Sequence, residues 1–449
     1  MYLEARELER AGELTKAVDM LEQVVQRAPN ERAPRNDLAV LYKRQRRYSD
    51  ALREFHAVST RFPTDVQSAN EVAFLLSFMG HQAVALATAK RALALDSTNA
   101  TTLHTLALIL LQMGQPELSR DTFASALSLA PDRAGTRMEY GMACVAMGDW
   151  LQGWAELEVR ETALGSATVF KALPTSPRWN GIDSIEGKRL LIVQEQGLGD
   201  SIMCARFATV LAARGATVLL HTMEPLVDLL GTVDGVTACF AGTGEFPPHD
   251  LHVPLMSLMH RLQVTPDTLR GDAYLAPQGE CPAHLAARLP RDGTPTVLLT
   301  WSGNPEHANN HRRSIRGELL APLLALPGVR FVALQKAPEM HAVLPSDLHN
   351  RVVDVGAECT SFHDSAHALR RADLVVTVDT AVAHLSGAIG APTLVCLPFC
   401  PDYRWGMTGS TTPWYESVTL MRQPEAGAWS AVIKDVIARV QALPTLGGR

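Results

Sequence analysis

The stretch RLLIVQEQGLGDSIMCARF, residues 189–207, shows most clearly how the larger part of the chain folds. It opens with RLLIV, which is typical of a buried strand, and a helical pattern follows from residue 201 to 213. Gly197 and Gly199 lie in the turn between them, and Asp200 comes next. Glycine allows a tight turn and a close approach of the backbone. The helix N-terminus offers free N–H groups to an anion or a hydroxyl, so this turn is a candidate binding element.

The turn does not match the common nucleotide-binding fingerprints. Ile202 stands where the third glycine of G-x-G-x-x-G belongs, and the lysine of a P-loop is missing. NAD and ATP chemistry are therefore disfavoured. Asp200 has two interpretations that the residues leave open: it caps a helix that begins at Ser201, or it acts as a general base aimed into a cleft.

Strand and helix patterns alternate along the rest of the chain. Further strands are expected at 216–222, 235–241, 250–255, 295–300, 329–335, 351–356, 372–379 and 392–398, with 285–295 as a linker. The strand runs are almost continuously apolar, as in parallel strands that are covered on both faces. Two such series predict two Rossmann-like domains with a cleft between them.

A second candidate turn lies in VTVDTAVAHLSGAIGAP, residues 376–392. Asp379 and Thr380 follow a strand and precede a helix, so they are placed to cap it and to present its free N–H groups to a phosphate. His384 lies one turn into that helix. It is either a structural histidine or part of the same anion site.

Polar and basic residues follow two other strands of this second series. WSGNPEHANNHRRSI (301–315) contains Asn304, His307 and Arg313, and Lys336 ends the motif LQK. A solvated loop is one interpretation of the first segment. A phosphate site is the other, and it is favoured because neighbouring strand ends converge in an open α/β sheet.

The first third of the chain repeats every 34 residues. The columns of the repeat are Gly12, Arg46, Gly80, Gly114 and Gly148; Pro29, Pro63, Ser97 and Pro131; and Ala17, Ala51, Ala85, Ser119 and Gly153. A glycine at a turn tolerates positive φ, small residues let paired helices approach, and proline ends the second helix. This pattern resembles the tetratricopeptide repeat over about residues 1–165.

Such arrays bind extended or helical peptides on their concave face. The repeats are therefore interpreted as a protein-docking module, with self-association or a spacer role as the alternative. Trp150 and Trp154 share one helical face at the end of the array. They are expected to pack the array against the next domain rather than to bind a ligand.

Composition excludes several other classes of protein. The net charge of -6 gives no general reason to expect nucleic acid. No run of about 18 apolar residues appears, so no transmembrane segment is expected. The charged N-terminus does not resemble a signal peptide. The seven cysteines form no C-x-x-C pair, which fits buried thiols in the cytoplasm. With no H-E-x-x-H and no D-x-D either, we expect no metal and no cofactor.

The ordered motifs of the second part resemble a known group of enzymes. Q-GLGD, WSGNPEH, LQK, DTAVAHLSGAIGAP, the LPFCPDYRWG segment and PWY together are similar to the heptosyltransferase-like, family 9 glycosyltransferases of GT-B fold in their tetratricopeptide-linked form. Some relatives with this layout glycosylate flagellin in the cytoplasm from a CMP-activated nonulosonic acid.

The resemblance implies roles only at matching positions. Asp200 would be the base on the acceptor hydroxyl, which favours the catalytic interpretation. Asp379, Thr380 and His384 would bind the donor phosphate. The remaining donor-side positions would be Gly197, Gly199, Asn304, His307, Arg313 and Lys336. Asn310 stands where the group usually has an acid, which argues against a charge-dependent role for that loop. Tyr403 and Trp405 are expected either to cover the nucleotide or to pack between domains.

The sequence therefore predicts three domains: a repeat array (1–165), an acceptor-side Rossmann-like domain (166–288) and a donor-side Rossmann-like domain (289–449). The predicted function is a cytoplasmic, metal-independent transfer of a sugar from a nucleotide donor to a protein acceptor such as flagellin. The alternatives are a catalytically silent scaffold or chaperone that keeps the sugar-nucleotide fold, and a transferase of the lipopolysaccharide type.

Overall fold

A computed structural model describes residues 1–170, 172–307, 309–336 and 344–443. The chain forms two compact units, Met1–Ala143 and Cys144–Arg449. The predicted three-domain division, with boundaries at 165 and 288, remains a prediction. Among the described residues, no helix has the length and apolar character needed to cross a membrane.

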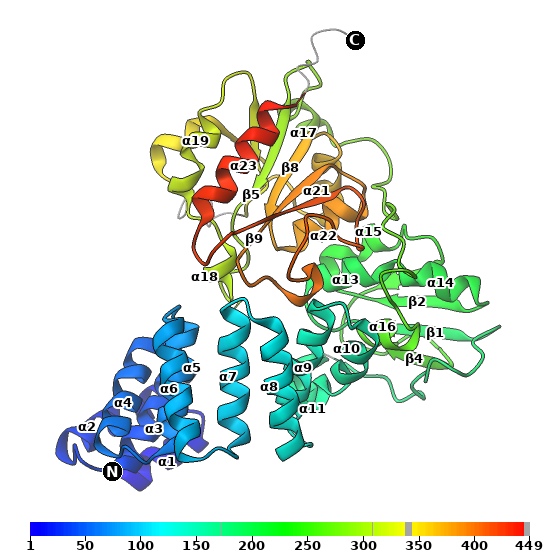
Figure 1. Cartoon of the computed structure of the whole chain (residues 1–449). Coiled ribbons are helices and arrows are strands. Elements are labelled where there is room, and N and C mark those ends of the chain that lie inside the picture. Colours follow the sequence, from blue (N-terminus) through cyan, green and yellow to red (C-terminus); the bar gives the residue numbers. More distant parts are fainter. Residues whose placement is uncertain (171, 308, 337–343, 444–449) are drawn as a thin grey trace. The chain divides into compact units, whose positions relative to one another are not determined.

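The first unit is an array of antiparallel helix pairs (Figure 1). Its helices are α1 (Tyr2–Arg10), α2 (Leu14–Arg27), α3 (Arg32–Arg44), α4 (Tyr48–Arg61), α5 (Val66–Phe78), α6 (Gln82–Leu95), α7 (Ala100–Gln112), α8 (Pro116–Leu129) and most of α9 (Ala134–Ala146), whose last turn belongs to the second unit. The helix-turn-helix pattern expected from the 34-residue period is confirmed. Helices α2, α4 and α8 end two residues before Pro29, Pro63 and Pro131 respectively.

The repeat columns have the backbone and packing that the period requires. Gly12, Gly80, Gly114 and Gly148 have φ values of 79°, 89°, 71° and 93°, and Arg46 adopts the same left-handed conformation at 59°. The small-residue column is buried at the contact between paired helices, with Ala17, Ala51, Ala85 and Ser119 each at 0% exposure. Any larger side chain there would push the paired helices apart.

Short helices open the second unit, and a four-stranded parallel sheet follows. The helices are α10 (Trp150–Leu157), α11 (Arg160–Leu164) and α12 (Ser166–Val169). The strands are β1 (Arg189–Val193), β2 (Thr217–His221), β3 (Val236–Phe240) and β4 (Leu251–Pro254), in the order β3-β2-β1-β4. The surrounding helices are α13 (Leu198–Ala205), α14 (Phe207–Ala213), η1 (Glu224–Leu226), α15 (Val227–Leu230), α16 (Ser257–Arg261) and α17 (Ala283–Arg288).

A six-stranded parallel sheet forms the rest of this unit. Its strands are β5 (Thr296–Thr300), β6 (Arg330–Ala333), β7 (Val352–Asp354), β8 (Leu374–Val378), β9 (Thr393–Leu397) and β10 (Val418–Arg422), in the order β10-β9-β8-β5-β6-β7. Its helices are α18 (Asn310–Arg313), η2 (Gly317–Leu320), α19 (Ala321–Leu324), η3 (Ser346–Arg351), α21 (Phe362–Leu369), α22 (Ala381–Ala388), η4 (Tyr403–Trp405) and α23 (Trp429–Gln441). The parallel pairing inferred from the apolar strand runs is confirmed in both sheets.

The strand order locates the place where a ligand is expected. In the six-stranded sheet the chain moves outward from β5 in one direction through β6 and β7, and in the other through β8, β9 and β10. Between β5 and β8 the winding therefore reverses, and open α/β sheets bind ligands at the carboxyl ends of the strands beside such a point. The loop after β5 contains Asn304, His307 and Arg313 of the predicted donor side, and the turn after β8 contains Asp379 and Thr380.

One expectation about the connections was wrong. The stretch 285–295 was predicted to be a linker, but its first residues belong to α17, where Leu285 is fully buried. Helix α17 packs on α21 with this leucine buried, and local composition does not reveal such packing. Residues 289–295 form an irregular connection.

Candidate functional site

The candidate site lies where helices α13 and α22 pack directly against each other (Figure 1). Helix α13 follows β1 of the smaller sheet, and α22 follows β8 of the larger one. Both helices therefore begin at the carboxyl ends of parallel strands, and this packing joins the two halves of the second unit. The two turns singled out from the sequence lie close together for this reason.

Asp200 caps α13, but from a different position than the sequence suggested. The helix begins at Leu198 rather than Ser201, so Asp200 is its third residue. Its Oδ2 accepts a hydrogen bond from the Gly197 backbone N–H at 3.0 Å, and its Oδ1 pairs with the Arg404 guanidinium. The expected start was wrong because Gly197, in an extended conformation, provides the N-cap.

Close approach explains Gly199, whereas the strained residue of this turn is not a glycine. A Cβ on Gly199 would lie 2.7 Å from Cδ2 of His384, so α13 and α22 require a glycine at their contact. The residue with positive φ is Gln196, at 62°. The Gln194 side chain bonds the Gln196 carbonyl at 3.0 Å and supports this conformation. Backbone strain of this kind concentrates at functional turns.

His384 is buried and held on several sides. Its Nδ1 lies 3.0 Å from the Tyr415 hydroxyl, and its ring stacks on Trp405 with centroids 5.2 Å apart. Burial, with the nearby charge of Arg404, lowers the pKa of His384 to about 3. The imidazole is therefore neutral at pH 7, so it contributes hydrogen bonding rather than charge.

Asp379 and Thr380 stand at the beginning of α22, as predicted. Thr380 is the N-cap, and its Oγ1 accepts from the Val382 N–H at 3.2 Å. Burial and the negative charge of Asp402 raise the pKa of Asp379 to about 6. The Trp405 indole lies close to this carboxyl, although its N–H does not meet the geometry of a hydrogen bond. Asp379 is thus an acid whose charge is incompletely compensated.

Arg404 and Asp402 are site residues that the sequence analysis missed. Arg404 Nη1 bonds Asp402 Oδ1 at 2.7 Å, while its Nη2 pairs with Asp200. Burial alone would raise the pKa of Asp402, but the charge and hydrogen bonds of Arg404 hold it below the ordinary value. The PDYRWG motif drew attention to the aromatic residues beside Arg404, although the arginine makes the ionic contacts.

The loop after β5 brings a second arginine to the site. Asn310 Oδ1 accepts from the Gly303 N–H at 3.1 Å, and a Cβ on Gly303 would lie 2.6 Å from the Arg313 guanidinium. The charge of Arg313 acts on both Asp379 and His307. Partial burial, and then Arg313, lower the pKa of His307, whereas Asp402 and Asp200 act in the opposite direction. Arg313 and His307 therefore lie close to the acids of the site.

Two other predicted donor-side residues make local contacts instead. Asn304 Oδ1 accepts from the Glu306 N–H at 2.9 Å within its own loop. The Lys336 ammonium group donates to the backbone carbonyls of Gly356, at 3.2 Å, and Cys359. In the LQK motif it is Gln335 that links neighbouring strand ends, through two 3.1 Å hydrogen bonds to the backbone of Ser302.

Trp150 and Trp154 pack against residues 403–414 within the second unit, while their expected place between the array and the next domain stays a prediction. Trp150 stacks on Trp414 with centroids 5.2 Å apart, and Trp154 meets Tyr403 edge-on. Tyr403 has a packing role here, while Trp405 covers His384.

A buried ion pair fixes the strand that precedes the first turn. Arg160 of α11 forms two hydrogen bonds with the carboxylate of Glu195, at 2.7 and 2.6 Å. Glu195 is fully buried and also accepts from the Met256 N–H at 2.7 Å. Both carboxylate oxygens are therefore satisfied, and the end of β1 is held in place by α11.

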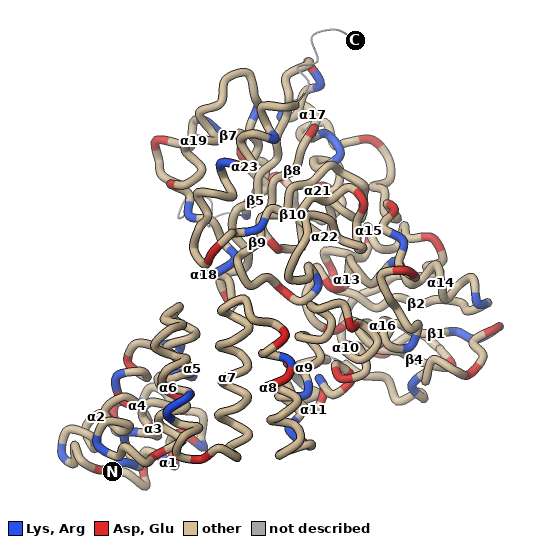
Figure 2. Tube along the Cα trace, viewed as in Figure 1, with Lys and Arg blue, Asp and Glu red and all other residues tan. Residues whose placement is uncertain are grey.

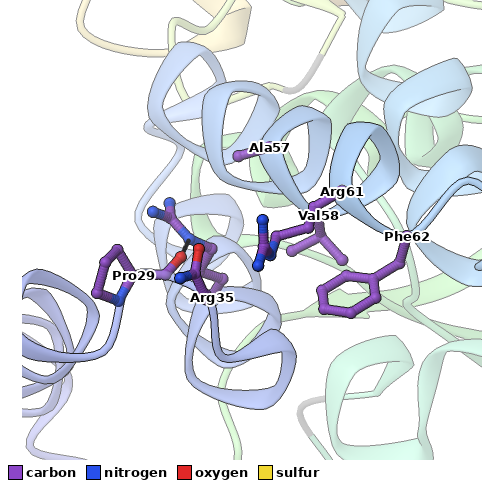
Figure 3. A pocket seen from close by; sticks show the side chains of 7 residues that line it. Pro29, Arg35, Ala57, Val58, Arg61 and Phe62 are labelled. Carbon is purple, nitrogen blue, oxygen red and sulfur yellow. Dashed lines mark hydrogen bonds between the residues drawn. The ribbon is translucent and has the colours of Figure 1, made fainter.

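The repeat unit carries a small hollow of its own (Figure 3), with a volume of about 240 Å³. It is lined by Pro29, Asn30, Arg35, Ala57, Val58, Arg61 and Phe62. Arg35 is already engaged by the Pro29 carbonyl and Glu54. Acidic and basic residues are interspersed along the other helices of the repeat unit, whereas α7 carries no Lys, Arg, Asp or Glu (Figure 2).

Part of the chain matches a repeat family, and comparisons with known proteins give similarities of limited extent. Residues 100–133, which form α7, α8 and their flanking turns, match the tetratricopeptide repeat model. Protein FlbA of Caulobacter vibrioides is 26% identical, over 94% of this chain and 80% of that protein. A MamA structure from Desulfovibrio magneticus superposes with a TM-score of 0.32 at 17% identity, covering 37% of this chain and 94% of that one. A thermophilic TPR protein of Thermus thermophilus gives 0.32 at 16% identity, covering 36% and 95%.

The match to the repeat model and the fold agree on the layout of the chain. Tetratricopeptide repeats, which bind other proteins, precede an α/β region with two parallel sheets. The similarity to Protein FlbA spans both parts.

Proposed function

We propose that the α/β region is a glycosyltransferase of GT-B type, which moves a sugar from a nucleotide donor to a protein held by the repeats. One observation carries the proposal. Asp200, the capped N-terminus of α22, and the cations Arg313 and Arg404 converge at the carboxyl ends of two parallel sheets. An acid beside an anion-binding helix end is the arrangement that transfer from a phosphate-linked donor needs.

Buried donors support a phosphate ligand on the α22 side. Arg313 Nε, Arg404 Nε and Trp405 Nε1 are buried and have no hydrogen-bond partner within the described part of the chain. Buried N–H groups almost always have an acceptor in folded proteins. Phosphate oxygens are strong acceptors, and arginine binds them in a two-pronged geometry.

In the proposed reaction Asp200 takes the proton of the acceptor hydroxyl. The acceptor oxygen then forms a bond with the anomeric carbon, while the bond from that carbon to the phosphate oxygen breaks. The electron pair leaves with the nucleotide, whose growing negative charge is stabilised by the helix N-terminus and the arginines. No metal ion is needed to supply positive charge in this scheme.

The acceptor is proposed to be a protein because the repeats are a docking module. The resemblance in sequence suggests flagellin as this acceptor and a CMP-activated nonulosonic acid as the donor. The repeats would hold the acceptor and raise its effective concentration near Asp200.

The first test is nucleotide binding. Thermal shift of the purified chain against CMP, UDP, GDP, ADP, NAD and ATP should show stabilisation by CMP, about 2.7 kcal/mol at a hundredfold excess over Kd. Arg313→Gln should weaken that response. Arg316→Gln, an exposed arginine three residues further on, is the matched control. Failure of every nucleotide to stabilise the chain would refute a sugar-nucleotide donor.

The second test is transfer itself. Asp200→Asn should abolish sugar transfer to co-expressed flagellin, read by intact-protein mass, while the variant still binds CMP. The hydrogen bonding of Asp200 also favours a second function, that of a silent scaffold, because both of its oxygens are already engaged. A wild-type chain that binds CMP and flagellin yet transfers nothing would establish that scaffold function.

A further inference from the structure

Arg404 is shared between two carboxylates that come from different halves of the second unit. Its Nη2 pairs with Asp200 Oδ1 on α13, and its Nη1 bonds Asp402 Oδ1, two residues before it, at 2.7 Å. The side chains are 12% exposed for Arg404 and 16% for Asp200. The pair is therefore largely shielded from water, where ionic contacts are stronger than at an open surface.

Of the two donor nitrogens Nε and Nη2 of Arg404, only Nη2 has a hydrogen-bond partner among the described residues. Nε and Nη2 point their N–H groups to the same side of an arginine, and a carboxylate or phosphate can take both at once. Asp200 takes Nη2 alone, because its Oδ2 is committed to the Gly197 N–H. Nε has no partner among the described residues. A phosphate that spans Nε and Nη2 would therefore compete with Asp200 Oδ1 for Nη2.

The backbone that carries Arg404 is fixed, so only its side chain has to move. The Arg404 N–H donates to Asp402 Oδ1 at 3.0 Å, and its carbonyl accepts from Trp414 Nε1 at 3.0 Å. Arg422 donates to the carbonyls of Trp405 and Gly406, at 2.6 and 2.9 Å. These contacts hold the backbone of Arg404 without using the Nε–Nη2 edge of its guanidinium.

Arg404 also lies close to the start of α22. Its positive charge acts on Asp379, which precedes the N-cap Thr380, and on His384 in the first turn of that helix. A phosphate bound at this helix end is within the electrostatic reach of Arg404. The same cation thus faces the proposed base on one side and the proposed phosphate site on the other.

We propose that the Asp200–Arg404 pair is a latch operated by the donor. A phosphate of the bound nucleotide takes the Nε–Nη2 edge of Arg404 and releases Asp200 Oδ1, which then accepts the proton of the acceptor hydroxyl. The inference rests on the proposed function and adds its regulation. The base is exposed only when a donor is present, so donor binding precedes deprotonation of the acceptor.

The latch makes Asp200 a competitor of the nucleotide. If Arg404 is free of Asp200 in about a tenth of the molecules, the apparent Kd for the nucleotide is about tenfold weaker than the intrinsic one. Removal of the carboxylate charge removes this penalty. Asn at position 200 keeps a side-chain oxygen that can accept the Gly197 N–H, so the helix cap is retained.

The test is calorimetric titration of CMP into four full-length chains: wild type, Asp200→Asn, Arg404→Lys, and the double variant. Lysine keeps the positive charge beside Asp402 but lacks the two-pronged edge. We expect Asp200→Asn to tighten CMP binding about tenfold when Arg404 is present. In the Arg404→Lys background the same substitution should change the Kd less than about twofold. Urea unfolding of each chain verifies that all four are folded.

The outcomes separate the latch from the proposed function. Equal tightening by Asp200→Asn in both backgrounds would mean general repulsion between the carboxylate and the phosphate, and would overturn the latch alone. Unchanged or weaker CMP binding by Asp200→Asn would overturn it as well. If the wild-type chain does not bind CMP, the proposed donor is wrong and the latch falls with it.

Discussion

Removing the charge of Asp379 should stabilise the protein, which is unusual for an acid beside a helix N-terminus. Burial and Asp402 raise its pKa to about 6 from the ordinary 3.8. The folded protein therefore resists ionisation of this carboxyl. Above pH 6 the carboxylate is charged at a free-energy cost that the unfolded chain does not bear. Asp379→Asn is predicted to relieve that cost.

The magnitude follows from the two pKa values. Each tenfold difference in proton affinity corresponds to about 1.4 kcal/mol, so a pKa of about 6 against the ordinary 3.8 corresponds to about 3 kcal/mol at pH 8. Because folding raises the pKa of Asp379, the free-energy cost of its charge is full at pH values above the folded-state pKa. The cost disappears as the pH falls through the ordinary pKa of 3.8. A gain of this size should raise the unfolding midpoint of the second unit by about 5 °C.

The assay is thermal unfolding of wild type and Asp379→Asn at pH 8, 6 and 4.5. The gain should be largest at pH 8, nearly as large at pH 6, and about a third as large at pH 4.5. Asp364→Asn on α21 is a control for which a change in stability of the opposite sign is expected. Burial alone would raise the pKa of Asp364, but hydrogen bonds from Thr360 and Ser361 hold it below the ordinary value. That variant should lose about 1 kcal/mol at pH 8.

An Asp379→Asn gain that does not change with pH, or a loss of stability at pH 8, would contradict this prediction. A pH-independent gain would point to better packing of the amide rather than to relief of charge. A loss would show that the Trp405 indole and the arginines compensate the carboxylate fully in the folded protein.

Three further predictions concern helix packing, a buried charge and backbone strain. Gly199→Ala places a Cβ 2.7 Å from His384 Cδ2. It should lower the free energy of unfolding in urea by about 1–3 kcal/mol and weaken CMP binding. An unchanged midpoint of urea unfolding would contradict the tight contact of α13 and α22. Arg160→Met leaves the carboxylate of Glu195 buried without its cation and should cost about 3–5 kcal/mol of unfolding free energy. Arg160→Met combined with Glu195→Leu should recover most of that loss. Equal losses in the single and double variants would show that the buried charge is not the cause. Arg46→Gly relieves a residue at φ 59° and should stabilise the first unit by about 1 kcal/mol; a loss would mean that the Arg46 side chain outweighs the strain.

The repeat array and the two sheets were readable from the sequence because their signals are local. A glycine or arginine at the same turn every 34 residues reflects one backbone conformation, and it appears with positive φ at all five positions. Apolar strand runs reflect burial on both faces of a sheet. Neither signal depends on contacts between distant parts of the chain.

The contacts of the site were not readable in the same way. Asp200 and Arg404 are 204 positions apart, and nothing in the periodicity around either residue indicates the other. Lys336 was expected in the cleft, yet its ammonium group binds the carbonyls of Gly356 and Cys359, whose positions depend on the turn after β7. Motifs identified the segments that meet, while side-chain partners depend on how the two sheets are joined.

The two acids of the site differ in a way that bears on function. Asp200 has a cation and a backbone N–H on its two oxygens, so its charge is compensated within the fold. Asp379 is buried beside another acid, and its pKa is raised because compensation is incomplete. A compensated carboxylate can serve stability alone. An uncompensated one lowers stability, and such residues are retained chiefly where function needs them. If Asp379→Asn stabilises the fold and also changes nucleotide affinity, stability and function are opposed at the N-terminus of α22, as expected of an anion site and not of a structural helix cap.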